Sequence, residues 1–205
     1  MDRRSFILAG TALAGISLAG GTRASAALQQ VLFDPDAPAL GNAKGDLTIV
    51  EYFDYQCPYC RSNHPMLMDE VRRDGNIRLV MKDLPVLGPV SRRAARMALG
   101  SVDLGLYAAV NAALMATRGR LSDRSVDSAL RRAGVSPDAA WKSFTAQEDK
   151  WERLIVRNLD QADDLGFWGT PSYVIGQVIA PGVIDRQALR ETIAEARQIG
   201  MPSRG

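Results

Sequence analysis

The sequence has little of what several classes of protein depend on. Its 205 residues include two cysteines, one histidine and only 6% aromatic residues. Two cysteines exclude a scaffold held by many disulfides, and one histidine leaves few ligands for an all-protein zinc site. A formal net charge of +2 is too balanced for a protein built around nucleic-acid phosphates. The 46% hydrophobic and 23% charged residues that are present are typical of a soluble globular chain.

The N-terminal segment also lacks an apolar run long enough to cross a bilayer. Its run of about 14 apolar residues falls short of the roughly 20 that a spanning helix needs. The run follows Arg3-Arg4 and ends in Ala24-Ser-Ala26, a small-x-small cleavage pattern. The arginine pair resembles a twin-arginine export signal; a general secretory signal and an uncleaved anchor are the alternatives. We therefore predict a signal peptide over residues 1–26.

The chain from residue 27 onward is formally neutral, with 22 basic and 22 acidic residues. Its first part, 27–46, is rich in Pro, Gly and Asp and predicts an extended lead-in. The near-continuous apolar run 47–53 predicts a buried parallel strand. A helix is expected to begin at Pro58, and a second strand to run over 77–82.

Helical spacing of apolar residues then dominates the chain as far as residue 168. Ser122 and Ser136 are placed to cap two of these helices at their N-termini. Phe144 and Trp151 continue the helical pattern, and we interpret them as the core of this helical region.

The order of the elements predicts an α/β fold. Short strands are expected over 172–175 and 178–179, followed by a last helix capped by Asp185. Together with the first strand–helix–strand unit they give a core, residues 47–83 and 169–200, interrupted by a helical insert over 84–168.

The motif Cys57-Pro58-Tyr59-Cys60 lies where the first strand meets the first helix. Pro58 suits the first helical turn and so places Cys57 at the helix cap, where unpaired backbone N–H groups favour a thiolate. A stabilised thiolate attacks disulfides and is also a good leaving group from them. Cys60 lies within disulfide reach and further inside the helix. We therefore predict a redox pair in which Cys57 reacts first, with no other cofactor.

Three other interpretations of the motif are weaker. A structural disulfide between Cys57 and Cys60 would close a minimal loop and stabilise little. Both cysteines could bind zinc with His64, but that set lacks a ligand, so we predict no metal site. A coincidental pair in an unrelated fold is disfavoured by the strand–CxxC–helix context.

Glu51 is the only charge in the first predicted strand, six residues before Cys57. A carboxylate there can exchange a proton with Cys60 while the disulfide opens. The alternative is an acid satisfied by a neighbour such as Lys82.

The segment Gly169-Thr170-Pro171 stands immediately before a predicted strand. Proline at a strand start cannot donate to the ladder, and the glycine before it permits a sharp approach. A cis Thr170–Pro171 bond would leave the Thr170 backbone free to pair with an extended substrate; an ordinary trans bond is the alternative.

Three motifs together carry a family resemblance: Glu51-Tyr-Phe-Asp-Tyr-Gln-Cys-Pro-Tyr-Cys60, Lys82-Asp-Leu-Pro-Val-Leu-Gly-Pro89 and Gly169-Thr-Pro171. They resemble the DsbA-like thiol oxidoreductases, exported members of the thioredoxin superfamily with a helical insert. The resemblance covers about residues 33–198 and implies a thioredoxin-like fold, a central mixed sheet flanked by helices.

The resemblance also implies roles for residues. Cys57 is then the exposed nucleophile, Cys60 the buried thiol, Pro171 the facing cis-proline after Thr170, and Glu51 the acid below them. Such an enzyme introduces disulfides into translocated proteins in the periplasm through a mixed disulfide at Cys57. Its partners would be thiol-containing exported proteins and a membrane redox protein, and a monomer is expected.

Two positions depart from the best-known periplasmic oxidase, which has other residues in place of Tyr59 and Thr170. Tyr59 offers no positive charge to the thiolate, so we expect a less oxidising potential. Thr170 is common in isomerase relatives, although 27–46 is too short for their oligomerisation domain. A disulfide isomerase or reductase kept reduced by a membrane donor is therefore one alternative. A peptide-binding chaperone is another.

Overall fold

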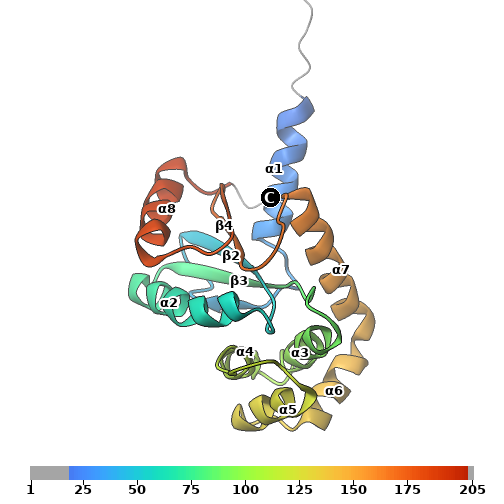
Figure 1. Cartoon of the computed structure of the whole chain (residues 1–205). Coiled ribbons are helices and arrows are strands. Elements are labelled where there is room, and N and C mark those ends of the chain that lie inside the picture. The colour runs from blue at the N-terminus through green and yellow to red at the C-terminus, as the bar shows by residue number, and fades with distance from the viewer. Residues whose placement is uncertain (1–18, 203–205) are drawn as a thin grey trace, which may run out of the picture.

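The computed structural model describes residues 19–202, and Figure 1 shows a sheet covered by helices. The first 18 residues of the predicted signal peptide lie outside the described residues. The strands are β1 Ala39–Gly41, β2 Leu47–Phe53, β3 Ile77–Asp83, β4 Ser172–Ile175 and β5 Val178–Pro181. They form one mixed sheet in the order β1-β3-β2-β4-β5, in which only β2 and β3 run parallel. This architecture confirms the predicted α/β class.

The helices of the described residues are α1 Ala19–Leu32, α2 Pro58–Asp74, α3 Pro89–Gly100, α4 Tyr107–Met115, α5 Asp123–Arg132, α6 Pro137–Ala146, α7 Glu148–Asp164 and α8 Arg186–Ile199. Ser122, Ser136 and Asp185 each accept a hydrogen bond from the backbone N–H three residues on, which confirms the predicted N-caps of α5, α6 and α8. None of these helices is both long and apolar enough to cross a membrane.

Both faces of the sheet are buried, and each has its own hydrophobic cluster. Side chains alternate between the faces along a strand, so Ile49 and Phe53 of β2 lie on one face, with residues of α2, α3, α4 and α8. Val50 and Tyr52 lie on the other face, with residues of α1 and α7. All seven residues of β2 are buried, as the continuous apolar run predicts.

The extended lead-in predicted over 27–46 is wrong in its first part. Helix α1 continues to Leu32, and β1 then pairs with β3. Leu28, Val31 and Leu32 recur at helical spacing, and the last two are buried against the second face of the sheet. Burial of that apolar stripe stabilises a helix where composition alone indicates an extended chain.

Helices α3 to α6 form the insert, a separate layer below the sheet in Figure 1. Helices α3 and α6 pack closely at Gly100, where a Cβ atom would lie 2.1 Å from the Ala140 carbonyl oxygen. Helix α7 then leaves this layer and packs against β3. Phe144 and Trp151 are buried core residues, as predicted, and the cluster that they join extends beyond the helical region to Val50 on the second face of the sheet.

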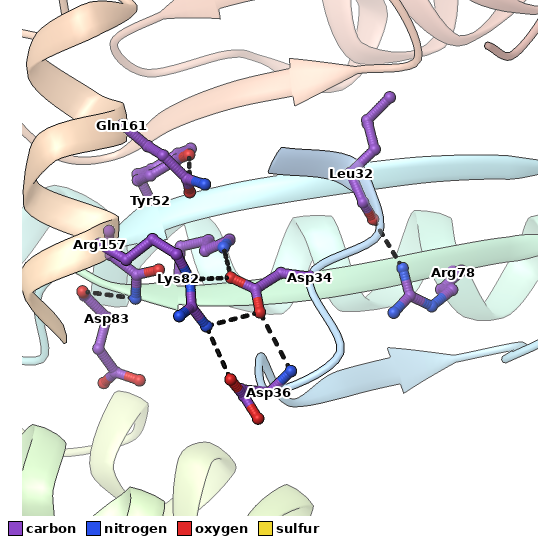
Figure 2. A network of polar contacts seen from close by, with 10 residues as sticks. Leu32, Asp34, Asp36, Tyr52, Arg78, Lys82, Asp83, Arg157 and Gln161 are labelled. Carbon is purple, nitrogen blue, oxygen red and sulfur yellow. Dashed lines mark hydrogen bonds and ion pairs between the residues drawn. The ribbon is translucent and has the colours of Figure 1, made fainter. Parts of the chain in front are cut away.

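An ionic network anchors the second face (Figure 2). Asp34 lies between α1 and β1, and its carboxylate accepts from Lys82 Nζ at 2.5 Å and from Arg157 at 2.8 and 2.9 Å. Arg157 also bonds Asp36 at 3.0 Å. Burial acts to raise the pKa of Asp34, but hydrogen bonds from Arg157 and the charge of Lys82 outweigh it and lower that pKa. The network ties α7 and the segment after α1 to β3.

Candidate active site

Cys57 is the N-cap of α2, in an extended conformation with φ −66° and ψ 119°, and Pro58 is the first helical residue. The turn before it is set by Asp54, whose carboxylate accepts from the Gln56 N–H at 2.7 Å. The Asp54 carbonyl accepts from the Cys57 N–H at 3.0 Å. The cap position that the motif predicts is therefore present, with the first N–H groups of α2 directed at Cys57.

The two thiols are not joined by a disulfide, and both are buried, Cys60 completely. The expectation that Cys57 is exposed is therefore wrong, because the segment with Thr170 packs against its Sγ atom. A hydrogen bond with Cys60 is the main cause that lowers the pKa of Cys57, to about 5; burial opposes it, and Thr170 and the backbone N–H groups of Tyr59 and Cys60 support it. The same hydrogen bond, burial and the charge of Glu51 raise the pKa of Cys60. The site therefore places a ready thiolate beside a thiol that holds its proton.

The segment before β4 lies against the cysteines. The Cys57 Sγ atom lies 3.2 Å from the Thr170 carbonyl oxygen, and the Thr170–Pro171 peptide bond is cis. Tyr52 of β2 is paired with Ser172 of β4, and this pairing holds the segment beside the end of β2 from which α2 follows. The structure thus brings Thr170 and Pro171, predicted from sequence, next to Cys57.

Glu51 is completely buried on the face of the sheet that α2 covers. Neither of its carboxylate oxygens has a hydrogen bond of standard geometry within residues 19–202. Burial raises its pKa to about 8; the Tyr173 hydroxyl acts against this rise and the Cys57 thiolate adds to it. Glu51 and Cys60 are therefore two coupled proton-holding groups below the thiolate.

Lys82 does not neutralise Glu51, so the neighbour suggested from sequence is wrong. The parallel register pairs Glu51 with Met81, which places Lys82 on the opposite face of the sheet. There it bonds Asp34 instead. No cation of residues 19–202 pairs with Glu51 to hold it ionised.

Sequence reasoning missed a pair of polar residues beside Glu51. Tyr173 is the cross-strand neighbour of Glu51 and is completely buried. Its hydroxyl accepts from Asn63 Nδ2 of α2 at 2.8 Å. The spacing of Asn63, three residues after Cys60 on one helix, is the signal that could have suggested it.

The surface around Cys57 is apolar. Tyr59 is 63% exposed, and Trp168, two residues before Thr170, is 98% exposed. Leu87 is 44% exposed, and its carbonyl accepts from Gln56 Nε2 at 2.6 Å. Large apolar side chains left exposed around a reactive group fit contact with another polypeptide.

His64 and Pro65 follow Cys60 in α2, the first buried and the second exposed. His64 is largely buried, and burial lowers its pKa to about 4. Pro65 lies inside α2, and the helix continues past it to Asp74. Among residues 19–202 no group of three or more His, Cys, Asp and Glu side chains is arranged to hold a metal ion.

Residues 34–195 match the protein family described as thioredoxin. Among curated proteins, the chain is 27% identical over 166 residues to the Na(+)/H(+) antiporter NhaA 1 of Salinispora arenicola, of which it spans only 25%. It is 25% identical over 181 residues to the thiol:disulfide interchange protein DsbA of Bordetella parapertussis, covering 83% of this chain and 82% of that one.

Solved structures give the same result. A thioredoxin-like oxidoreductase from Silicibacter pomeroyi is 36% identical with a TM-score of 0.78, covering 82% of this chain and 97% of its own. A periplasmic thioredoxin-like protein from Salmonella enterica is 31% identical with a TM-score of 0.74, covering 82% and 95%. A thiol-disulfide exchange protein, alpha-DsbA2, from Wolbachia pipientis is 27% identical with a TM-score of 0.77, covering 87% and 98%. These likenesses confirm the predicted thioredoxin-like fold with its helical insert.

Proposed function

Because this chain belongs to the thioredoxin family and is a DsbA-like thiol:disulfide oxidoreductase with a CxxC pair, we propose that it introduces disulfides into exported proteins in the periplasm. The observation that carries the proposal is the asymmetry of the two thiols. The pKa of Cys57 is lowered to about 5, while that of Cys60 is raised. A thiolate so stabilised favours the reduced form of the enzyme and hence the oxidation of its substrate.

The exchange has two steps. A substrate thiolate attacks Cys57 of the Cys57–Cys60 disulfide, so that the mixed disulfide forms and Cys60 leaves with the electron pair of the broken bond. A second substrate thiolate attacks the substrate sulfur of the mixed disulfide and releases Cys57 as a thiolate. The substrate loses two electrons and two protons, and the enzyme is left as a dithiol. A membrane redox partner then accepts those electrons and restores the disulfide.

Glu51 supplies the proton that Cys60 takes up as it leaves, and accepts it back when Cys60 attacks during reoxidation. Its burial keeps it protonated at neutral pH, and no cation competes for it within the described residues. A proton donor at this depth is needed because Cys60 is closed to solvent.

Folding polypeptides are the substrates that fit the surface. Tyr59, Leu87 and Trp168 present apolar side chains around Cys57, and the Thr170 backbone lies beside Cys57, where an extended chain bound to that cysteine could pair with it. Export of the chain by its N-terminal signal, and action as a monomer, complete the proposal.

The potential is expected to be intermediate. A thiol pKa of about 5 lies between roughly 7 for thioredoxin and 3.5 for the strongest periplasmic oxidase. Between these two proteins the potential runs from about −270 to about −120 mV, so we expect a value between those limits.

Equilibration of the 27–205 protein with glutathione measures this potential directly. A second assay measures whether the enzyme catalyses the oxidative refolding of a reduced protein that has two disulfides in its native state. We expect a potential above about −200 mV and catalysis of refolding. A potential near −270 mV without catalysis would remove the oxidase assignment. The Cys57→Ala, Cys60→Ala double variant separates redox chemistry from a chaperone, since only a chaperone would keep its activity.

Thr170 favours one second candidate, a disulfide isomerase. A ribonuclease with scrambled disulfides is added to the reduced enzyme, and the recovery of ribonuclease activity is measured. This assay distinguishes an isomerase from an oxidase. An isomerase restores activity without net oxidation, whereas an oxidase requires its disulfide form.

A further inference from the structure

Charge is divided unevenly between the two parts of the molecule. The insert helices and their connections, residues 89–146, contain nine basic and four acidic residues. The rest of the chain from residue 27 onward contains thirteen basic and eighteen acidic residues. The formally neutral chain is therefore a basic insert on an acidic core, and a basic surface attracts acidic partners.

A cleft of about 620 Å³ opens between α3, α5 and α6 of this insert. Arg92, Arg93 and Arg96 of α3 line it, and Arg131 of α5 joins them. Trp141 adds an aromatic surface that is 44% exposed and stacked on Phe144, with ring centroids 5.6 Å apart. The cleft thus combines cationic groups with a fixed apolar contact.

Two of the four arginines are already paired. Arg93 bonds Asp127 at 2.6 Å, and Arg96 bonds Glu152 at 2.6 Å. The two others, Arg92 and Arg131, are exposed, and no ion pair joins either to a carboxylate of residues 19–202.

The acidic residues of the cleft do not cancel this charge. The lining contains two of them, Asp127 and Asp138, against four arginines. Asp138 lies in the first turn of α6, where a carboxylate also interacts with the N-terminal end of the helix dipole. Arg92 and Arg131 are therefore the groups free to bind carboxylates of another molecule.

The cleft adjoins the active site. Gly88 and Pro89 are among the residues that line it. Two hydrogen bonds hold the preceding residue, Leu87, to the turn before Cys57. The Leu87 N–H donates to the Asp54 carboxylate at 3.0 Å, and the Leu87 carbonyl accepts from Gln56 Nε2 at 2.6 Å. An extended polypeptide with its cysteine at Cys57 can therefore pass over residues 87–89 into the cleft.

We propose that this arginine cleft binds acidic side chains of the polypeptide whose cysteine reacts with Cys57, and so makes acidic thiol proteins the preferred substrates. Arg92 and Arg131 bind the carboxylates, and an aromatic or aliphatic side chain of the same segment packs on Trp141. The assignment rests on the proposed function and adds a substrate class to it.

The test uses two dithiol peptides of equal length that differ only in charge. One carries several Glu residues and a Phe beside its cysteines, and the other has Gln in place of each Glu. Their oxidation by the disulfide form of the enzyme is compared for wild type, Arg92→Glu/Arg131→Glu and Arg72→Glu/Arg153→Glu. The last variant makes the same charge change at exposed arginines outside the cleft. Dithiothreitol, an uncharged small dithiol, reports the basal reaction.

The cleft variant should oxidise the Glu peptide about tenfold more slowly than wild type, with the Gln peptide and dithiothreitol unchanged. The control variant should change each rate by less than about twofold. Equal losses for both peptides, or for both variants, would overturn the cleft assignment. Tighter binding of an oligothymidine than of the Glu peptide would overturn it in favour of nucleic acid. Failure of wild type to oxidise even dithiothreitol would instead contradict the proposed function.

Discussion

Two buried carboxyl groups on opposite faces of the same sheet behave in opposite ways. Asp34, on the face covered by α1 and α7, is held by Lys82 and Arg157, and its pKa is lowered. Glu51, on the face covered by α2, pairs with no cation of the described residues, and its pKa is raised to about 8. Burial alone raises the pKa of both groups, so the partners decide the difference.

The register of β2 and β3 separates the two roles. Lys82 stands one residue beyond Met81, the neighbour of Glu51, and so faces Asp34. An ion pair on one side fixes the structure, and an unpaired acid on the other keeps a proton available near Cys60. A single position along β3 thus determines which carboxyl group is held in an ion pair and which keeps its proton.

The largest effect on stability is expected from breaking the ionic network of Asp34, Lys82 and Arg157. Asp34→Asn leaves the fully buried Lys82 without a carboxylate and should lower the free energy of unfolding by about 4 kcal/mol. Asp36→Asn, at the half-buried end of the same network, is the control and should lower the free energy of unfolding by less than about 1 kcal/mol. Guanidinium unfolding measures both. Equal stability of Asp34→Asn and wild type would show that the network does not hold the second face together.

The face that carries Glu51 should lose stability as the pH rises from about 4.5 to about 8. Glu51 has a folded-state pKa of about 8, above its ordinary 4.5, so the folded state binds the extra proton and loses stability as the pH rises between those values. The slope is about 1.4 kcal/mol per pH unit. Glu51→Gln lacks this slope, so its free energy of unfolding should rise by about 3 kcal/mol relative to that of wild type between pH 5 and 7. The free energy of unfolding is measured for both proteins at several pH values. The same dependence on pH in both proteins would refute the raised pKa of Glu51.

The ionic face should respond to acid instead. The folded-state pKa of Asp34 is lowered, so the stability that it contributes is present above its ordinary pKa of 3.8 and is lost as the pH falls through the folded value. The advantage of wild type over Asp34→Asn should therefore shrink below about pH 4, by up to about 1.4 kcal/mol per unit. Thermal unfolding between pH 2.5 and 6 measures it. A constant difference would mean that the carboxylate is not the group responsible.

The smallest change tests the hydroxyl next to Glu51. Tyr173→Phe removes the acceptor of the Asn63 amide and should lower stability by about 1 kcal/mol. It also removes the group that lowers the Glu51 pKa, so the pH range over which stability is lost should extend to higher pH. An unchanged upper limit of that range would show that Tyr173 does not act on Glu51.

The sequence predicted the reactive part of the molecule better than its supports. The CxxC spacing with Pro58 and the apolar run of β2 depend on neighbouring residues, and both are present as predicted. The partner of Glu51 depends on which residue of β3 stands opposite, and a shift of one position reverses the face of Lys82. The helix before Leu32 depends likewise on a distant surface that buries its apolar stripe.

The reactivity of Glu51 is tested most directly by the pH dependence of disulfide formation within the reduced enzyme. Stopped-flow mixing with oxidised glutathione forms the mixed disulfide at Cys57, and the following phase reports the attack of Cys60. In wild type this phase should accelerate up to about pH 8, as Glu51 ionises and accepts the Cys60 proton. In Glu51→Gln it should be slower at pH 7 by about 10² and lack that inflection. Identical profiles in the two proteins would contradict the account.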